Sequence, residues 1–251
     1  MQNASRKPWY KTLSGLIFLI ILIIFLSVMA VFAVLFGYYS WQLKFAESEK
    51  IEKFEQQFSH HFTIDESLAK TPSASILEKD IAAFIRPNNP TFGDAAAPIT
   101  IVAFLDFECP FSQESYPIFK EAALKYEPVI QVIFKHFPLS TIHPSSLDAS
   151  LAAECAREQN KFWDYYNAVF EQKKLTKTSL STYAKELGLN EKIFTACLDG
   201  KKFVNQVQQD LRDGLELGVR GTPTYFVNNK KIEGVMTKEQ WDNIILKEME
   251  K

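Results

Sequence analysis

The chain has 251 residues, which is room for one good-sized domain with appendages or for two small domains. Its formal net charge of −2 provides no overall positive field, so we expect no nucleic-acid partner. Charged residues make up 23% of the chain, an ordinary share for a globular protein, but they are absent from one long segment near the N-terminus.

That segment, residues 13–39, is apolar and carries no charge. It exceeds the roughly 20 residues that cross a bilayer core, and aromatic residues flank it on both sides, as they do at membrane interfaces. A cleaved signal peptide is the alternative, but its apolar region would be shorter and followed by a small-x-small cleavage site. The preceding basic residues predict a cytoplasmic N-terminus by the positive-inside rule: Arg6, Lys7 and Lys11.

We therefore expect a single-pass signal-anchor protein of the cell membrane in a bacterial-type envelope. Its expected parts are a cytoplasmic N-terminus (1–12), a transmembrane helix (13–39), a juxtamembrane helix and linker (40–92) and an extracytoplasmic domain (93–251). The lipid bilayer is then a partner, and in the periplasm disulfides persist. The Glu- and Lys-rich stretch Gln42–Gln57 predicts a helix that is either a solvated stalk or a self-associating segment.

The extracytoplasmic part begins with a strand–helix–strand pattern. Residues 99–107 form an apolar run typical of a buried strand, residues 110–126 show helical periodicity, and residues 129–134 read as a second strand. This order is most simply a parallel crossover. A short helix near Ser75–Phe84 is expected to precede it.

The remainder reads as a helical block followed by a hairpin and a last helix. Five helices are expected over 146–158, 161–173, 179–187, 191–198 and 203–217. A hairpin follows over 223–235, and a capping box from Thr237 to Gln240 opens the final helix. The order predicts an α/β fold in which helices flank a four-stranded mixed sheet, with a helical insertion at about 140–215.

Cys109 lies in the sequence DFECPFS, where the first strand gives way to a helix. Free backbone N–H groups and the helix dipole favour a thiolate there, and the thiol pKa can fall from about 8.5 into the range of about 3.5–7.5. Pro110 suits the first helical turn, where its missing N–H has no partner to lose. From the residues alone, the alternative is that Cys109 is a buried and inert thiol.

Several ordered motifs over residues 90–251 together resemble the DsbA-like branch of the thioredoxin superfamily. They are PITIVAFLDFECPF, KHFPLSTIHP, AAECAREQNKFWDYYNAVF and GVRGTPTYFVNNKKIEG. The resemblance implies a thioredoxin fold with an inserted helical domain, and thiol–disulfide oxidoreductase activity without a cofactor. It also implies a cis Pro223 beside Cys109, with Thr222, Pro110 and Phe111 contacting the substrate; an edge-strand proline is the alternative for Pro223.

Ser112 is the departure from the family pattern, which has a second cysteine at this position. A dithiol oxidase stores its oxidising equivalent as a disulfide between the two cysteines, and a reductase needs the second thiol to release its product. Ser112 supports neither step, although its hydroxyl is expected to stabilise the Cys109 thiolate by hydrogen bonding. Cys109 is then the single nucleophile of a monothiol site.

The other two cysteines, Cys155 and Cys197, fall in the helical block. Three cysteines allow three pairings, and the resemblance favours a structural Cys155–Cys197 disulfide that leaves Cys109 free. Two separate buried thiols are the alternative.

Neither a metal nor a prosthetic group is expected. His136 and His143 lack the spacing of metal ligands beside a cysteine, and the chain has no nucleotide-binding glycine motif. The aromatic residues of 162–170 are interpreted as a helical core face, with an apolar peptide-binding surface as the alternative.

Three functional hypotheses follow. The first is a membrane-anchored oxidoreductase that exchanges or isomerises disulfides of cysteine-containing exported proteins, with a membrane-bound or small-thiol redox partner. The second is a peptide-binding or chaperone-like module without turnover. The third is a structural domain of an envelope complex.

Overall fold

The computed structural model describes residues 13–59, 73–76 and 80–250. The chain divides into two compact units, Met1–His61 and Phe62–Lys251, and each is described by itself. The basic residues that predict the orientation of the N-terminus lie outside the described residues.

The first unit contains one long helix, α1, at Leu13–Ser59. Within it, Ile20–Trp41 has a mean hydropathy of 3.0 and no buried residue, so by length and composition it is able to cross a membrane. The helix predicted to continue beyond residue 42 is confirmed, because α1 runs without a break to Ser59.

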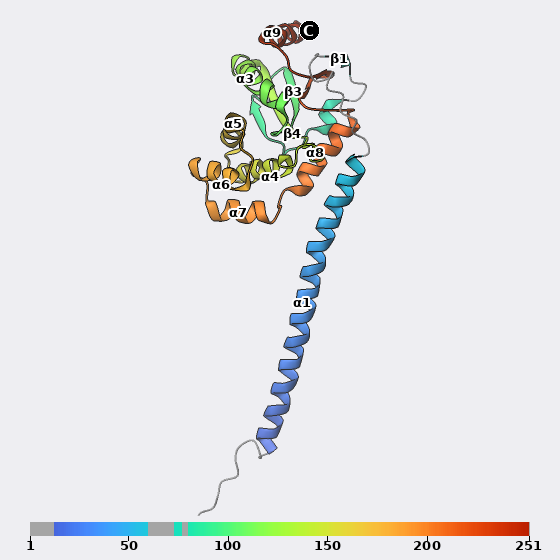
Figure 1. Ribbon diagram of the computed structural model, residues 1–251, viewed down its shortest axis with the longest axis vertical. Helices are drawn as coiled ribbons and strands as arrows, with labels where there is room; N and C mark the ends of the chain where they lie inside the picture. The colour runs from blue at the N-terminus through green and yellow to red at the C-terminus, as the bar shows by residue number, and fades with distance from the viewer. Residues whose placement is uncertain (1–12, 60–72, 77–79, 251) are drawn as a thin grey trace, which may run out of the picture. The chain divides into compact units, whose positions relative to one another are not determined.

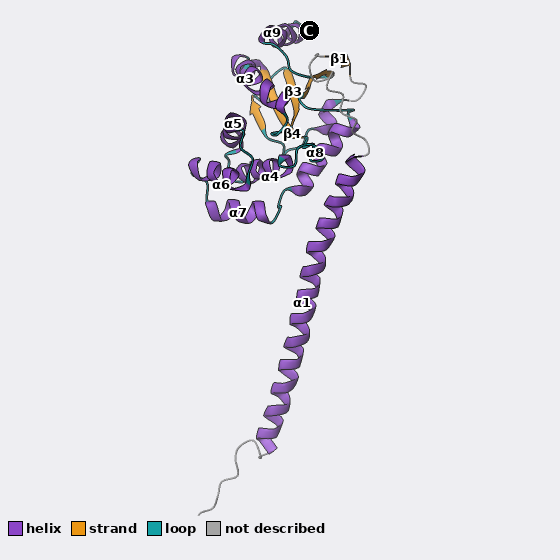
Figure 2. Ribbon diagram, viewed as in Figure 1, coloured by secondary structure: helices purple, strands orange, loops and turns teal. Residues whose placement is uncertain are grey.

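The second unit is built on a six-stranded sheet with the order β1-β6-β5-β3-β4-β2, drawn as orange arrows in Figure 2. The parallel pair predicted from the strand–helix–strand pattern is β3–β4, in which Ile99 pairs with Ile130 and Leu105 with His136. The other four pairings are antiparallel. The strands are β1 (Ser73–Ile76), β2 (Thr91–Gly93), β3 (Ile99–Leu105), β4 (Ile130–His136), β5 (Thr224–Val227) and β6 (Lys230–Glu233).

The predicted mixed sheet is confirmed, but the expected number of four strands is wrong. The edge strands β1 and β2 are additional, and both begin before residue 93. Only a 3₁₀ helix, η2 at Ile81–Phe84, forms where a helix was expected near Ser75–Phe84. Strands of three or four residues show too few alternations for a periodic pattern, so backbone pairing with β4 and β6 decides their structure.

Helices cover the sheet and form the insertion. The helix after β3 is α3 (Pro110–Lys125), which ends shortly before the 3₁₀ helix η3 (Glu127–Val129), and the last helix is α9 (Lys238–Met249). Figure 1 shows the predicted insertion helices α4 to α7 gathered together, away from α3 and α9. The five helices between β4 and β5 are α4 (Ser146–Arg157), α5 (Phe162–Gln172), α6 (Lys177–Glu186), α7 (Glu191–Asp199) and α8 (Val204–Glu216).

The aromatic face of α5 is part of the core, as predicted. Phe162, Tyr166 and Phe170 are buried, and the Phe107 ring lies 4.9 Å from that of Phe170. Trp163 is half-buried, and its indole N–H donates to the Thr91 carbonyl at 2.7 Å, which attaches β2 to the insertion. These aromatic contacts join the insertion to the end of β3, just before Cys109.

A buried ionic cluster lies between β4 and α8. The Lys135 ammonium contacts Asp210 at 2.9 Å and Asp213 at 2.7 Å, and its side chain is fully buried. Arg86 pairs with Asp213, and the Asn89 amide donates to Asp210 at 3.1 Å. A buried charge requires such partners, so the cluster holds α8 and the segment before β2 against the sheet.

Candidate functional site

Cys109 is the N-cap residue of α3 and follows β3 by four positions. Its backbone is extended (φ −64°, ψ 122°), so the loop after β3 ends at Cys109, and Pro110 occupies the first turn of the helix. The backbone N–H of Cys109 donates to the Asp106 carbonyl at 3.2 Å, which closes a turn between strand and helix. Cys109 is only 4% exposed.

A loop far away in the sequence covers this cysteine. The Thr222–Pro223 peptide bond is cis, and the Cys109 thiol donates to the Thr222 carbonyl at 3.2 Å. The two segments meet because β5 begins at Thr224, which pairs with Phe104 near the end of β3. The Thr222 hydroxyl is buried and, among the described residues, has no hydrogen-bond partner of normal geometry.

Burial raises the pKa of the Cys109 thiol, because removing water disfavours the thiolate. The Thr222 side chain and the backbone N–H groups of Ser112 and Phe111 lower the pKa, whereas the negative charge of Asp106 raises it further, and the net direction is upward. The sequence-based expectation of a lowered pKa is therefore wrong for the free protein. The sequence predicts that Cys109 lies at a helix N-terminus. It does not predict that a loop more than 110 positions later buries the thiol.

Ser112 is fully buried one turn into α3. Its hydroxyl accepts a weak hydrogen bond from the Asp106 N–H at 3.4 Å. Among the described residues no hydrogen bond joins this hydroxyl to the Cys109 sulfur, and it is the backbone N–H of Ser112 that stabilises a thiolate. Stabilisation of the Cys109 thiolate, which was expected from the Ser112 hydroxyl, therefore comes from the Ser112 backbone N–H.

Asp106 organises the floor of the site, a role that the sequence analysis did not assign. Its carboxylate is buried and accepts from the Glu108 N–H at 2.9 Å, the Leu139 N–H at 2.9 Å and the His143 imidazole Nδ1 at 2.7 Å. Glu108 in turn accepts from the Ser145 N–H at 2.6 Å. Two acids within three residues after an apolar strand are the signal in the sequence, and here they bind the loop that follows β4.

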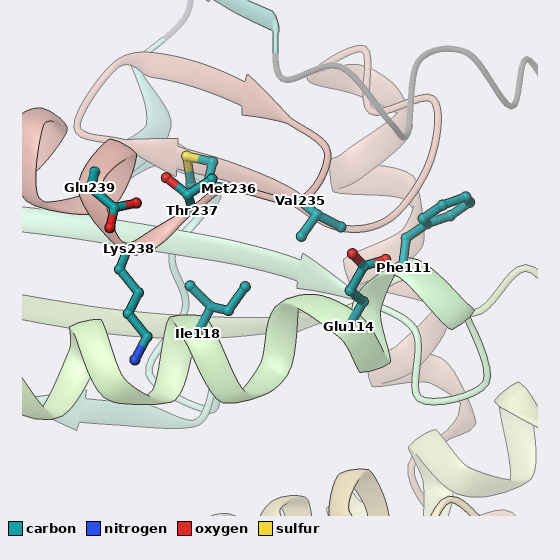
Figure 3. A pocket seen from close by; sticks show the side chains of 8 residues that line it. All are labelled: Phe111, Glu114, Ile118, Val235, Met236, Thr237, Lys238 and Glu239. Carbon is teal, nitrogen blue, oxygen red and sulfur yellow. The ribbon is translucent and has the colours of Figure 1, made fainter.

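A cavity of about 410 Å³ lies beside the CPFS motif, between α3 and the start of α9 (Figure 3). Phe111 belongs to both the motif and the cavity lining, two residues after Cys109 in the chain. Sequence reasoning did not find it, because five of its eight lining residues lie at least 110 positions beyond the end of α3. It is lined by Phe111, Glu114, Ile118, Val235, Met236, Thr237, Lys238 and Glu239.

The other two cysteines form a disulfide in the insertion. Cys155 on α4 and Cys197 on α7 have Cα atoms 5.8 Å apart, and Cys109 is the one free cysteine of the chain. His136 is fully buried and contacts Glu154 at 3.0 Å, while His143 contacts Asp106. Within the described residues, no group of three potential metal ligands occurs.

The sequence model of the family described as Thioredoxin matches residues 86–247, more than half of the chain. Among curated proteins, the Na(+)/H(+) antiporter NhaA 3 of Salinispora tropica is 35% identical over 144 residues. The NhaA antiporter of Herminiimonas arsenicoxydans is 31% identical over 143 residues. Each match covers 57% of this chain but 22% of the relative, so the chain spans about a fifth of these antiporters.

Solved structures share the fold. BdbD from Bacillus subtilis in its oxidised form has a TM-score of 0.62 and 24% identity, over 71% of this chain and 100% of that one. A thioredoxin-like oxidoreductase from Silicibacter pomeroyi DSS-3 has a TM-score of 0.62 and 21% identity, over 69% of this chain and 99% of that one. Alpha-DsbA1 of Wolbachia pipientis has a TM-score of 0.58 and 24% identity, and the match covers 65% of this chain and 92% of that one. With the family match and these structural neighbours, the chain belongs to the thioredoxin family and has the DsbA-like fold that its sequence predicts.

Proposed function

We propose that the protein is a membrane-anchored, extracytoplasmic thiol–disulfide oxidoreductase that uses Cys109 as its single nucleophile. The observation that carries this proposal is the position of the free Cys109 thiol, at the start of α3 and 3.2 Å from the carbonyl before the cis proline. The fold supplies the scaffold, and these groups supply the chemistry. Its substrates are cysteine-containing exported proteins.

The first step is attack by the Cys109 thiolate on a substrate disulfide. Cys109 loses its proton to solvent, a bond forms between its sulfur and one substrate sulfur, and the substrate S–S bond breaks. The other substrate sulfur leaves as a thiolate and takes up a proton. The N–H groups of Ser112 and Phe111 hold the negative charge on Cys109 before attack, and the backbone of Thr222 is placed to pair with an extended peptide.

The second step needs a thiol from elsewhere, because Ser112 has none. If a further cysteine thiol of the substrate, other than the one released in the first step, attacks the substrate sulfur, a new substrate disulfide forms and the Cys109 thiolate leaves, which amounts to isomerisation. A small external thiol or a membrane-bound partner is able to resolve the same mixed disulfide. Cys155 and Cys197 are bonded to each other and are not free thiols.

The proposed location follows from α1. A membrane-spanning segment at Ile20–Trp41, with basic residues before it, leaves the N-terminus in the cytoplasm and the thioredoxin domain outside. A structural neighbour from Salmonella enterica is described as a periplasmic thioredoxin-like protein, which supports this location. The disulfide in the insertion is also consistent with an oxidising compartment.

Burial of Cys109 favours a second candidate function. A thiol that is 4% exposed and has a raised pKa is a weak nucleophile at neutral pH. The same domain could then bind cysteine-containing or apolar peptides without turnover, as a chaperone-like module. The cavity beside Phe111 supports this reading as well.

Reaction of the full chain in non-ionic detergent with a disulfide-linked peptide separates the candidates. We expect the wild type to release one half of the peptide and to gain the mass of the other half, and Cys109→Ala to do neither. Peptide binding without release would favour the chaperone-like module. Absence of both binding and release would leave a structural domain and refute the proposed activity.

A further inference from the structure

We propose that the cavity beside Phe111 selects substrates that carry an apolar side chain and a basic side chain close to the reactive disulfide. This inference rests on the proposed function and specifies its substrate class. The occupant is an extended segment of the substrate polypeptide, one sulfur of which reaches Cys109.

The cavity shares Phe111 with the CPFS motif. Phe111, two residues after Cys109, forms one end of its lining, and Figure 3 shows Glu114 and Ile118 following it along α3. A segment that brings a sulfur to Cys109 therefore has its neighbouring residues beside this lining. The spacing of about 3.3 Å per extended residue places only the next few residues within reach.

The middle of the cavity is apolar. Ile118 on α3 lies opposite Val235, and Met236 follows Val235 in the loop before α9. Ile118 and Val235 are half-buried, so part of their apolar surface is open to a ligand. A medium-sized apolar side chain of the substrate would remove this surface from water, which favours binding.

The charge around this apolar surface is negative. Glu114 on α3 and Glu239 in the first turn of α9 both line the cavity, are exposed, and form no ion pair within the described part of the chain. Lys238 also lines it, but its ammonium pairs with Glu121. Although the charge of Lys238 also acts on Glu239, the lining and Glu121 together have three carboxylates and one ammonium, and this excess of negative charge attracts a basic side chain.

Exposed carboxylates of this kind should discriminate only moderately between basic and acidic peptides, and the strength of this discrimination should depend on the salt concentration. Each exposed ion pair contributes little, so two together support a preference of about threefold to tenfold. The preference should act mainly on the rate of association and should decline as salt screens the charges.

The test uses two disulfide-linked peptides that are identical except for one residue next to a leucine beside the reactive cysteine, lysine in one and glutamate in the other. The second-order rate of adduct formation on Cys109 is measured with the full chain in non-ionic detergent. At low salt, the wild type should react about threefold to tenfold faster with the lysine peptide. Replacing the leucine by serine should slow both peptides.

The Glu114→Gln/Glu239→Gln double variant should lose the preference for lysine and keep adduct formation. Glu186→Gln removes one exposed carboxylate on α6, away from the cavity lining, and should retain the preference. Equal rates for both peptides with the wild type, or an unchanged preference in the double variant, would overturn this inference alone. Failure of every peptide to form an adduct would instead overturn the proposed function.

Discussion

Removing the disulfide in the helical insertion should destabilise the domain measurably. Cys155 and Cys197 close a loop of 42 positions, and both are buried at the contact of α4 with α7. In the chain-entropy model, releasing a loop of this length from the unfolded chain changes the unfolding free energy by about 4 kcal/mol. The Cys155→Ala/Cys197→Ala double variant should therefore unfold at a temperature lower by about 8–16 °C.

The assay is a denaturant titration of the full chain in non-ionic detergent, followed by tryptophan fluorescence, since Trp241 is fully buried. The dependence of the unfolding free energy on denaturant should become steeper in the double variant, because its unfolded chain exposes more surface without the cross-link. Cys109→Ala serves as the control, because it removes a thiol outside the bridge. A loss below about 1 kcal/mol in the double variant would refute the view that the bridge stabilises the insertion by restricting the unfolded chain.

Three further predictions concern stability. The folded chain keeps Cys109 protonated at a pH where a free thiol ionises, so the unfolding free energy should fall as pH rises above about 8.5, a dependence that Cys109→Ala should lack in denaturant titrations. Gly214→Ala places a Cβ atom 2.5 Å from the Phe137 ring and should lower the unfolding free energy by about 1–3 kcal/mol, whereas Gly221→Ala meets open space and should leave it nearly unchanged. Asp210→Ala deprives the buried Lys135 of one of its two carboxylates and should lower the thermal unfolding midpoint, with a loss of about 3–5 kcal/mol; a loss no larger than that of an exposed ion pair would contradict the cluster's role.

Elements with strong local patterns could be predicted from the sequence. The apolar run of β3 and the capping box at Thr237 appear where the residues indicate, because burial on both faces and a reciprocal cap leave clear signals. The edge strand β2 could not be predicted, since it has three residues and depends on pairing with β4. Its Gly93 has a positive φ of 87° and packs against the Ile130 carbonyl, a requirement that appears only in three dimensions.

The candidate site shows the same division. The residue types and their order indicated Cys109 and the loop at Pro223, which the structure places together. The pKa of Cys109 was predicted in the wrong direction, because it depends on burial by that distant loop. The cavity and the contacts of Asp106 also depend on distant segments, so they required the structure.

The fate of the mixed disulfide tests the central claim most directly. The full chain is incubated with an excess of a disulfide-linked peptide whose two halves carry one cysteine each, so that no second substrate thiol within the adduct is able to resolve it, and is then quenched with acid and examined by intact mass. We predict one peptide adduct, on Cys109, that persists until an external thiol is added, and an adduct in Ser112→Cys that disappears without added thiol as a 109–112 disulfide forms. The absence of an adduct in the wild type, or its release there without any added thiol, would contradict a single-cysteine mechanism.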